Sequence, residues 1–123
     1  MVTRLIGVYD ADGTLRGELA YWIGARLGRA HCALCDITHS SVRERADWRA
    51  CRDRLPVPLD TFHRDDQPDH IRPITDGNLP CVVADTLAGP VVVAGPAELD
   101  ACHGSGDALV VLIDRALADL DVR

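Results

Sequence analysis

The sequence predicts a single domain of the α/β class. Continuous runs of aliphatic and β-branched residues, at 4–9, 81–84 and 91–94, are typical of buried strands. In two other stretches, 15–27 and 107–120, apolar residues recur at the spacing of amphipathic helices. Strands that alternate with helices indicate an α/β fold. The length of 123 residues suits one domain with its own hydrophobic core.

Turn and capping signals indicate where the expected elements begin and end. Gly28 suits the C-terminus of the first helix, and Ser41-Val42-Arg43-Glu44 forms a capping box that predicts a second helix. Gly89-Pro90 predicts a turn between two strands. The expected strands are 4–9, 57–63, 81–84 and 91–94. The expected helices are 15–27, 42–54, 96–102 and a last helix capped by Asp107.

The composition argues against several classes of function. The net charge of −6 disfavours a surface for nucleic acid or for an anionic membrane. All thirteen basic residues are arginine. The chain therefore has neither the lysine of a phosphate-binding P-loop nor a lysine for Schiff-base chemistry.

The apolar pattern and the cysteine count predict a cytoplasmic protein. The apolar run at 1–7 is too short for a signal peptide, and acidic residues follow it at once. No apolar run approaches the length of a membrane span. Structural disulfides are rare in the cytoplasm, so five cysteines indicate metal binding, transient redox chemistry or filling of the core.

The segment HCALCDITH, residues 31–39, has the most specific chemical signal in the chain. It contains two of the five cysteines and two of the five histidines. Two thiols separated by two residues can close a small disulfide ring or bind one soft metal ion. If the segment is helical, Cys32, Cys35 and His39 share one face. If the helix begins near Cys32, its dipole also stabilises a thiolate there.

One interpretation of this segment is a redox dithiol. Cys32 is then the attacking thiolate, and Cys35 resolves the mixed disulfide. His31 and the end of the helix favour the thiolate form of Cys32. This chemistry needs no cofactor, and the expected partner is a protein or a small molecule with a thiol or a disulfide.

A second interpretation is a metal site. Cys32, Cys35 and His39 supply three ligands at plausible spacing, and His63 or His31 supplies a fourth. Two thiolates with imidazoles favour zinc among the common metals, although copper or iron also fits.

The order of the expected elements resembles that of thioredoxin-like proteins, with a βαβ half followed by a ββα half. The resemblance implies a two-layer α/β sandwich with a mixed sheet. In that family a proline, usually cis, precedes the third strand and faces the CxxC pair, and Leu79-Pro80-Cys81 occupies the equivalent place. Pro80 therefore joins Cys32 and Cys35 as a candidate catalytic residue. The helix expected at 15–28 is a departure, because thioredoxin-like proteins place the CxxC directly after the first strand.

The chain also resembles a group of small uncharacterised bacterial proteins that share three marks. The first is a tyrosine–acidic turn after the first strand, here Tyr9-Asp10-Ala11-Asp12. The second is a CxLCxxT segment, here residues 32–38, and the third is His63-Arg64-Asp65 after a later strand. The resemblance implies that these three patches converge on one site.

A third interpretation comes from Asp10-Ala11-Asp12-Gly13-Thr14, which follows the first expected strand. It resembles the opening DxDGT motif of haloacid-dehalogenase-like phosphatases, which implies that Asp10 is the nucleophile and Asp12 the acid/base, with magnesium nearby. That family has a longer doubly wound sheet and a late aspartate pair, whereas Asp65-Asp66 lies mid-chain. An ordinary Asp-Gly turn explains the same residues.

Thiol–disulfide exchange is the function that the sequence favours over a metal site and over phosphatase chemistry. Its centre is the Cys32/Cys35 pair, supported by His39, His63 and Pro80. A binding protein without enzymatic activity is the remaining class, because negative charge and few aromatic residues say little about a partner.

Overall fold

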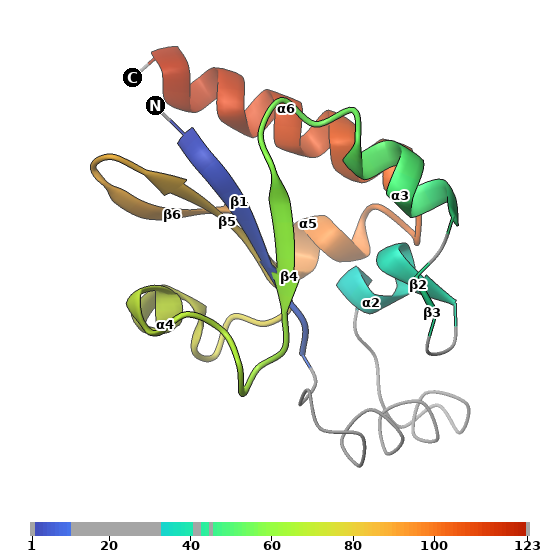
Figure 1. Cartoon of the computed structure of the whole chain (residues 1–123), viewed down its shortest axis with the longest axis horizontal. Coiled ribbons are helices and arrows are strands. Elements are labelled where there is room, and N and C mark those ends of the chain that lie inside the picture. The colour runs from blue at the N-terminus through green and yellow to red at the C-terminus, as the bar shows by residue number, and fades with distance from the viewer. Residues whose placement is uncertain (1, 11–32, 41–42, 45, 123) are drawn as a thin grey trace.

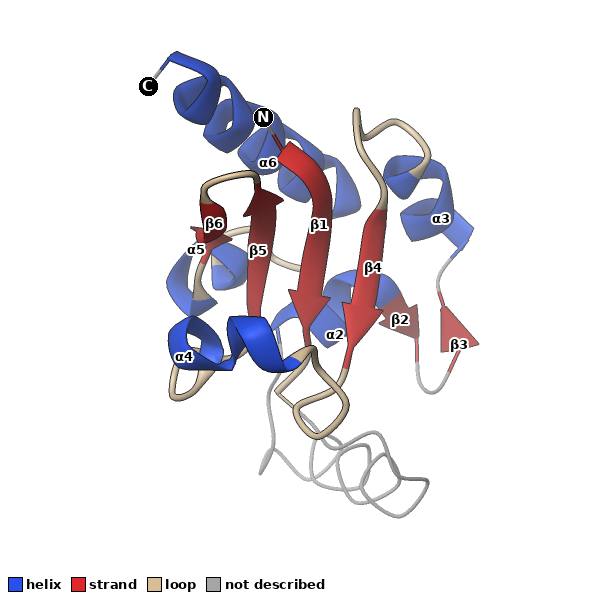
Figure 2. Ribbon diagram, turned by 60° about the vertical axis from the view of Figure 1, so that its left-hand side comes forward, coloured by secondary structure: helices blue, strands red, loops and turns tan. Residues whose placement is uncertain are grey.

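Four strands form one mixed sheet in the order β4-β1-β5-β6 (Figure 2). The computed structural model describes residues 2–10, 33–40, 43–44 and 46–122, so the helix expected at 15–27 lies outside the described residues. The strands are β1 (Val2–Val8), β4 (Leu59–Phe62), β5 (Cys81–Thr86) and β6 (Gly89–Ala94). β1 runs parallel to β4 and antiparallel to β5, and β5 and β6 form an antiparallel hairpin. The prediction of an α/β domain with a mixed sheet is confirmed.

β1 is buried on both of its faces. Leu5, Ile6 and Val8 have no exposed surface. Successive side chains of a strand point to opposite faces, so Leu5 packs in one layer and Ile6 and Val8 in the other. Burial on both faces explains why β1 has a continuous apolar sequence rather than an alternating one.

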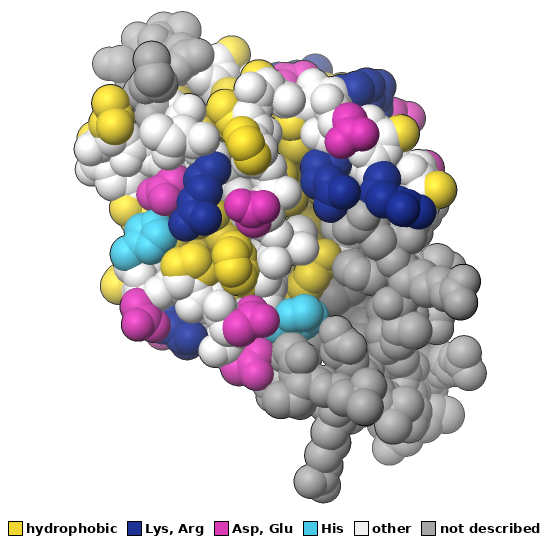
Figure 3. Space-filling model, viewed as in Figure 1, with side chains coloured by type: hydrophobic (Ala, Val, Ile, Leu, Met, Phe, Trp, Pro, Cys, Tyr) yellow, Lys and Arg dark blue, Asp and Glu magenta, His cyan; other side chains and the backbone are white. Residues whose placement is uncertain are grey.

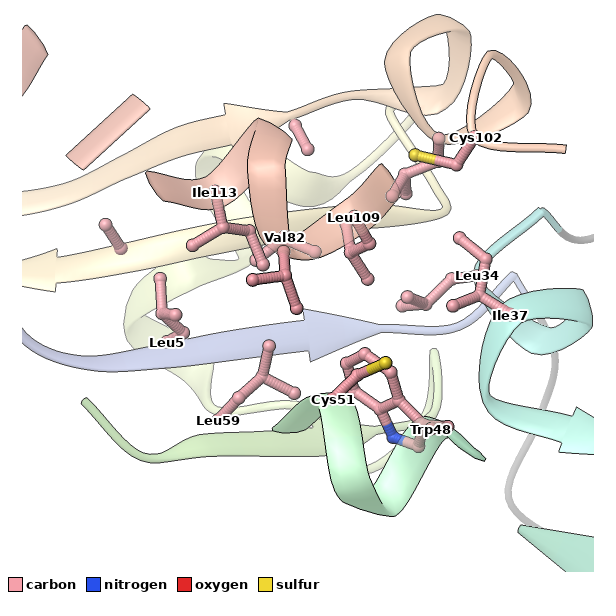
Figure 4. Packing of buried hydrophobic residues seen from close by; sticks show 14 of the residues in the cluster. Leu5, Leu34, Ile37, Trp48, Cys51, Leu59, Val82, Cys102, Leu109 and Ile113 are labelled. Carbon is pink, nitrogen blue, oxygen red and sulfur yellow. The ribbon is translucent and has the colours of Figure 1, made fainter. Parts of the chain in front are cut away.

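Helices from distant parts of the chain cover one face of the sheet. They are α2 (Ala33–Thr38), α3 (Ala46–Arg52), α5 (Pro96–Asp100) and α6 (Gly106–Val122). α6 is a long helix with α3 beside its N-terminal part (Figure 1). One hydrophobic cluster joins Leu5 of β1 to Leu34, Trp48, Leu109 and Ile113 of the helices (Figure 4). Each of these buried aliphatic side chains contributes about 1.5–3 kcal/mol of transfer free energy.

The opposite face of the sheet has a smaller apolar cluster of its own. Ile6, Val8, Cys81 and Val83 pack there against Ile71. Ile71 belongs to a 3₁₀ turn, η1 (Asp69–Ile71), which leads into the short helix α4 (Arg72–Thr75). η1 and α4 therefore cover part of the second face of the sheet, which the expected two-layer arrangement would leave uncovered.

The region after α2 also differs from expectation. A two-stranded sheet pairs β2 (His39–Ser40) with β3 (Arg43–Glu44). Residues 43–44 are paired in β3 rather than helical, and α3 begins at Ala46, later than the capping box predicted. Strands of two residues are too short to leave a periodic signal in the sequence.

Charged side chains of both signs are interspersed on the surface (Figure 3). Arg4 Nε lies 3.5 Å from Asp85 Oδ2, and His70 Nε2 lies 3.2 Å from the same oxygen. Within the described residues, no helix is both long enough and apolar enough to cross a membrane.

Candidate functional site

The CxxC segment is helical from the residue that directly follows Cys32. α2 begins at Ala33, and Cys35 is its third residue. Cys32 itself and the side chains of Cys35 and His39 lie outside what the structure describes. α2 ends at Thr38, and His39 belongs to β2. The shared face predicted for Cys32, Cys35 and His39 required a helix through His39, and α2 ends one residue before it.

α2 packs closely on β1 at a glycine. A Cβ atom at Gly7 would lie 3.3 Å from Leu34 Cδ2 and 3.4 Å from Thr61 Cγ2. Leu34 and Ile37 are both fully or almost fully buried and point into the core (Figure 4). The missing side chain at Gly7 lets the helix approach the strand near the strand's carboxyl end. The CxxC helix thus lies at that end of β1, although residues 11–32 intervene in the sequence.

Tyr9 connects the end of β1 to this helix. Its hydroxyl lies 2.9 Å from Thr38 Oγ1, and Thr38 Oγ1 donates a hydrogen bond of 3.1 Å to the Leu34 carbonyl. Tyr9 is 3% exposed and Thr38 is fully buried. A buried polar pair of this kind is costly to leave unpaired, so it fixes the position of the helix.

Tyr9 also contacts the loop that follows β4. The backbone N–H of Tyr9 donates to the Phe62 carbonyl at 2.9 Å, which extends the β1–β4 pairing by one residue. The rings of Tyr9 and His63 lie 5.3 Å apart between centroids and are tilted by 53°. One residue further, Arg64 donates to Asp10 Oδ1 at 3.4 Å.

These contacts bring the three sequence patches together. Tyr9 and Asp10 belong to the first patch, Thr38 to the second, and His63 and Arg64 to the third. The prediction that the three patches converge is confirmed for these residues. Their meeting point is the end of the sheet where β1 and β4, which are parallel, both finish.

The loop after β4 is held in shape by its own hydrogen bonds. The backbone N–H of His63 donates to Asp66 Oδ1 at 2.6 Å, and His63 Nδ1 lies 3.6 Å from Asp66 Oδ2. The buried side chain of Gln67 donates to the Arg64 carbonyl at 3.0 Å and accepts from Thr75 Oγ1. Gln67, Asp66 and Thr75 were not candidates from the sequence, because a polar loop of Asp, Gln and Pro has no periodicity that marks a buried residue.

Pro80 lies at the same end of the sheet. It is buried and directly precedes β5, and its peptide bond with Leu79 is cis. The next residue, Cys81, pairs with Val8 of β1. Pro80 is thus placed beside the stretch of β1 that leads into Tyr9.

The three cysteines whose side chains the structure describes are buried, and of these Cys81 lies at the same end of the sheet as Tyr9. Cys51, Cys81 and Cys102 form no disulfide. Burial raises the pKa of the Cys81 thiol to about 11, and burial also raises the pKa of Cys102. Cys51 Sγ accepts a hydrogen bond of 3.3 Å from Arg54. Protonated, buried thiols are poor nucleophiles, so Cys81 and Cys102 suit the core, and Cys51 is buried as well.

The metal site remains a prediction, because the structure does not describe the side chains of most of its expected ligands. Among the described residues, no group of three or more His, Cys, Asp or Glu side chains is placed to hold a metal ion. Cys32 and the side chains of Cys35 and His39 are outside that set, and His63 is the one predicted ligand within it.

The phosphatase interpretation finds little support in the sheet. Asp10 is described and is paired with Arg64, whereas Asp12 lies outside the described residues. β1 has one parallel and one antiparallel neighbour, so the sheet is not the doubly wound parallel one that the DxDGT resemblance implies.

No protein-family model matches this chain, and neither the curated proteins nor the solved structures contain a match to it. Its class is therefore inferred from the geometry of its own residues.

Proposed function

We propose that the protein is a thioredoxin-like dithiol protein that exchanges disulfides through Cys32 and Cys35. One observation carries this proposal. The helix that directly follows Cys32 packs on the carboxyl end of β1, at the end of the sheet where Pro80 precedes β5. This is the relation between a CxxC helix, a first strand and a proline that the thioredoxin-like resemblance implies.

The strand order supports the same proposal. β1 and β4 are parallel and form the first half, and the β5–β6 hairpin followed by α5 and α6 forms the second half. The halves join by antiparallel pairing of β1 with β5. A βαβ unit joined in this way to a ββα unit is the arrangement that thioredoxin-like proteins share.

The proposed chemistry uses both cysteines in turn. The Cys32 thiolate attacks one sulfur of a partner disulfide, a mixed disulfide forms, and the other partner sulfur leaves as a thiolate. The Cys35 thiolate then attacks Cys32 Sγ and releases the second partner sulfur. Cys32 and Cys35 end as a disulfide, and the two electrons have reduced the partner. The reverse sequence oxidises a partner dithiol.

The buried cysteines make the proposal specific to one pair. Cys81 and Cys102 have raised pKa values because they are buried, which keeps them protonated near neutral pH. Exchange with a protein or small-molecule disulfide in the cytoplasm would therefore use Cys32, which precedes α2, and Cys35, the third residue of α2. A cytoplasmic thiol pool would return the pair to its reduced form.

Intact mass spectrometry with differential alkylation tests this function. Protein purified without reductant or chelator should be lighter by two hydrogens than reduced protein, with the bond mapped to Cys32 and Cys35. Cys32→Ser and Cys35→Ser should each abolish that difference, and Cys102→Ser, a control at a buried core thiol, should retain it. An alkylation pattern with both thiols free after mild oxidation would contradict the proposal.

The same spectra separate the metal interpretation from the dithiol. A heavier native species that falls to the apo mass on acidification would indicate a bound metal ion, and the difference would identify it. Zinc bound through Cys32, Cys35, His39 and His63 should then be lost in His39→Ala and His63→Ala. Retention of the metal in both histidine variants would remove these histidines from the ligand set.

A further inference from the structure

We infer that Tyr9 is a positioning residue for the Cys32/Cys35 dithiol, acting through Thr38 on the helix that carries Cys35. The inference rests on the proposed function, because it assigns a role within that site. It is drawn from a chain of two buried hydrogen bonds that runs from Tyr9 to Thr38 and on to the Leu34 carbonyl.

The direction of this chain follows from the number of hydrogens available. A threonine hydroxyl has one hydrogen, and that of Thr38 is donated to the Leu34 carbonyl. Thr38 Oγ1 therefore accepts in its contact with Tyr9, and the Tyr9 hydroxyl is the donor. Both groups are buried, so water does not compete for the two bonds, and hydrogen bonds linked through one hydroxyl polarise each other.

The chain ends within the CxxC motif. The Leu34 carbonyl belongs to the peptide bond that links Leu34 to Cys35, and Thr38 lies three residues after Cys35 in the same helix. A disulfide tolerates only a narrow range of separation and orientation between its two cysteines. A restraint on the Leu34–Cys35 peptide thus acts on the geometry in which the ring closes.

Tyr9 is itself fixed from the other side. Its backbone N–H is bonded to the Phe62 carbonyl, and its ring is covered by His63, whose backbone N–H is bonded to Asp66. The backbone and the ring of Tyr9 are therefore positioned by β4 and the loop after it, and only its hydroxyl contacts the helix in these bonds. Through its contact with Thr38, Tyr9 therefore holds α2 against the end of β1.

The equilibrium between the dithiol and the disulfide, measured against ratios of reduced to oxidised glutathione, tests the inference. Tyr9→Phe removes the donor, and Thr38→Val removes the intermediate hydroxyl. Each should shift the equilibrium constant by about fivefold in the same direction, the loss expected for one neutral hydrogen bond. The double variant should shift it no further than either single one, because both changes interrupt one chain. Thr38→Ser, which keeps the hydroxyl, should stay close to wild type.

Thr86→Val is the matched control, because the Thr86 hydroxyl also donates one hydrogen bond, at 2.6 Å to the Gly89 carbonyl, and Thr86 pairs with Val2 at the opposite end of β1. It should lower the midpoint of urea unfolding without changing the redox equilibrium. If Tyr9→Phe lowers the unfolding midpoint and leaves the dithiol–disulfide equilibrium unchanged, Tyr9 has only a structural role. The inference is then overturned, and the proposed dithiol function is unaffected. A wild-type protein that forms no reversible Cys32–Cys35 disulfide overturns both. Tyr9→Phe is the decisive variant if Thr38→Val does not fold.

Discussion

Leu34 of the CxxC helix rests on Gly7 of the central strand. A Cβ atom at Gly7 would lie 3.3 Å from Leu34 Cδ2, which is closer than side chains usually pack. Leu34 is fully buried at this contact, and Thr61 of β4 lies on the neighbouring side. The distance between α2 and the sheet is therefore set by the absence of a side chain at one position.

Gly7→Val should destabilise the fold, because its methyl groups overlap with Leu34 and Thr61. The expected loss is about 1–3 kcal/mol in the free energy of unfolding, measured by urea titration. Gly7→Ala should cost less, since only one carbon is added. In a Leu34→Ala background the cost of Gly7→Val should shrink, because the space is already vacated. Additive costs in that double variant would contradict the proposed contact.

Cys81 should make stability fall in alkaline solution. Burial raises its pKa in the folded protein from 9.0 to about 11. The contribution of Cys81 to the free energy of unfolding is complete below pH 9.0, where the thiol is protonated in both the folded and the unfolded state. It is lost as the pH rises toward about 11, because in this range the unfolded chain releases the proton while the folded protein retains it. The slope attributable to Cys81 is about 1.4 kcal/mol per pH unit.

Comparison with Cys81→Ala isolates this effect. The variant loses some packing at every pH, but the gap between wild type and variant should narrow between pH 9.0 and about 11. Curves of unfolding free energy that stay parallel over this range would show that Cys81 does not titrate as expected.

Gln67→Ala should loosen the loop that carries His63 and Arg64. The Gln67 side chain is 3% exposed and bridges the Arg64 carbonyl to the Thr75 hydroxyl. Its removal leaves both partners without that bond, at a cost of about 1–3 kcal/mol. Faster amide hydrogen exchange in 63–67 together with a lower unfolding midpoint is the expected result. Asp69→Ala serves as the control, because the Asp69 side chain is 98% exposed and its pair with Arg72 is on the surface.

Asp107 should contribute to stability only above acidic pH. The hydrogen bond from Arg54 lowers the pKa of Asp107 below its ordinary value of 3.8. This contribution is present above pH 3.8 and is lost as the pH falls through the lower, folded-state value. Asp107→Asn should therefore lower the Tm slightly at neutral pH and match wild type in acid. Both side chains are largely exposed, so added salt should also reduce the difference. A difference in Tm that persists in acid and in salt would assign the effect to another cause.

The elements that the sequence predicts well are those in which local pattern and burial agree. The apolar runs of β1, β5 and β6 correspond to strands, and the stripe of apolar residues that includes Leu109 and Ile113 corresponds to the buried side of α6. The convergence of Tyr9, Thr38 and His63 is likewise predictable, but only through the resemblance to the CxLCxxT group.

The elements that the sequence misses depend on distant partners. α4 contains Pro73 and precedes the Asp76-Gly77 turn, so its residues read as irregular, yet Ile71 just before it is fully buried against the second face of the sheet. The β2–β3 pair interrupts a stretch whose capping box favours a helix. The hydrogen bond from Tyr9 to Thr38 joins residues far apart in sequence, and no local pattern encodes it.

The position of β1 in the sheet also determines when this site can exist during synthesis. Val8 pairs with Phe62 on one side and with Cys81 on the other, so the central strand leaves the ribosome long before either neighbour. Until then the backbone groups of β1 have no strand to bond, and folding waits on contacts of high sequence separation. The end of the sheet around Tyr9 can therefore form only after the chain has been synthesised through Cys81.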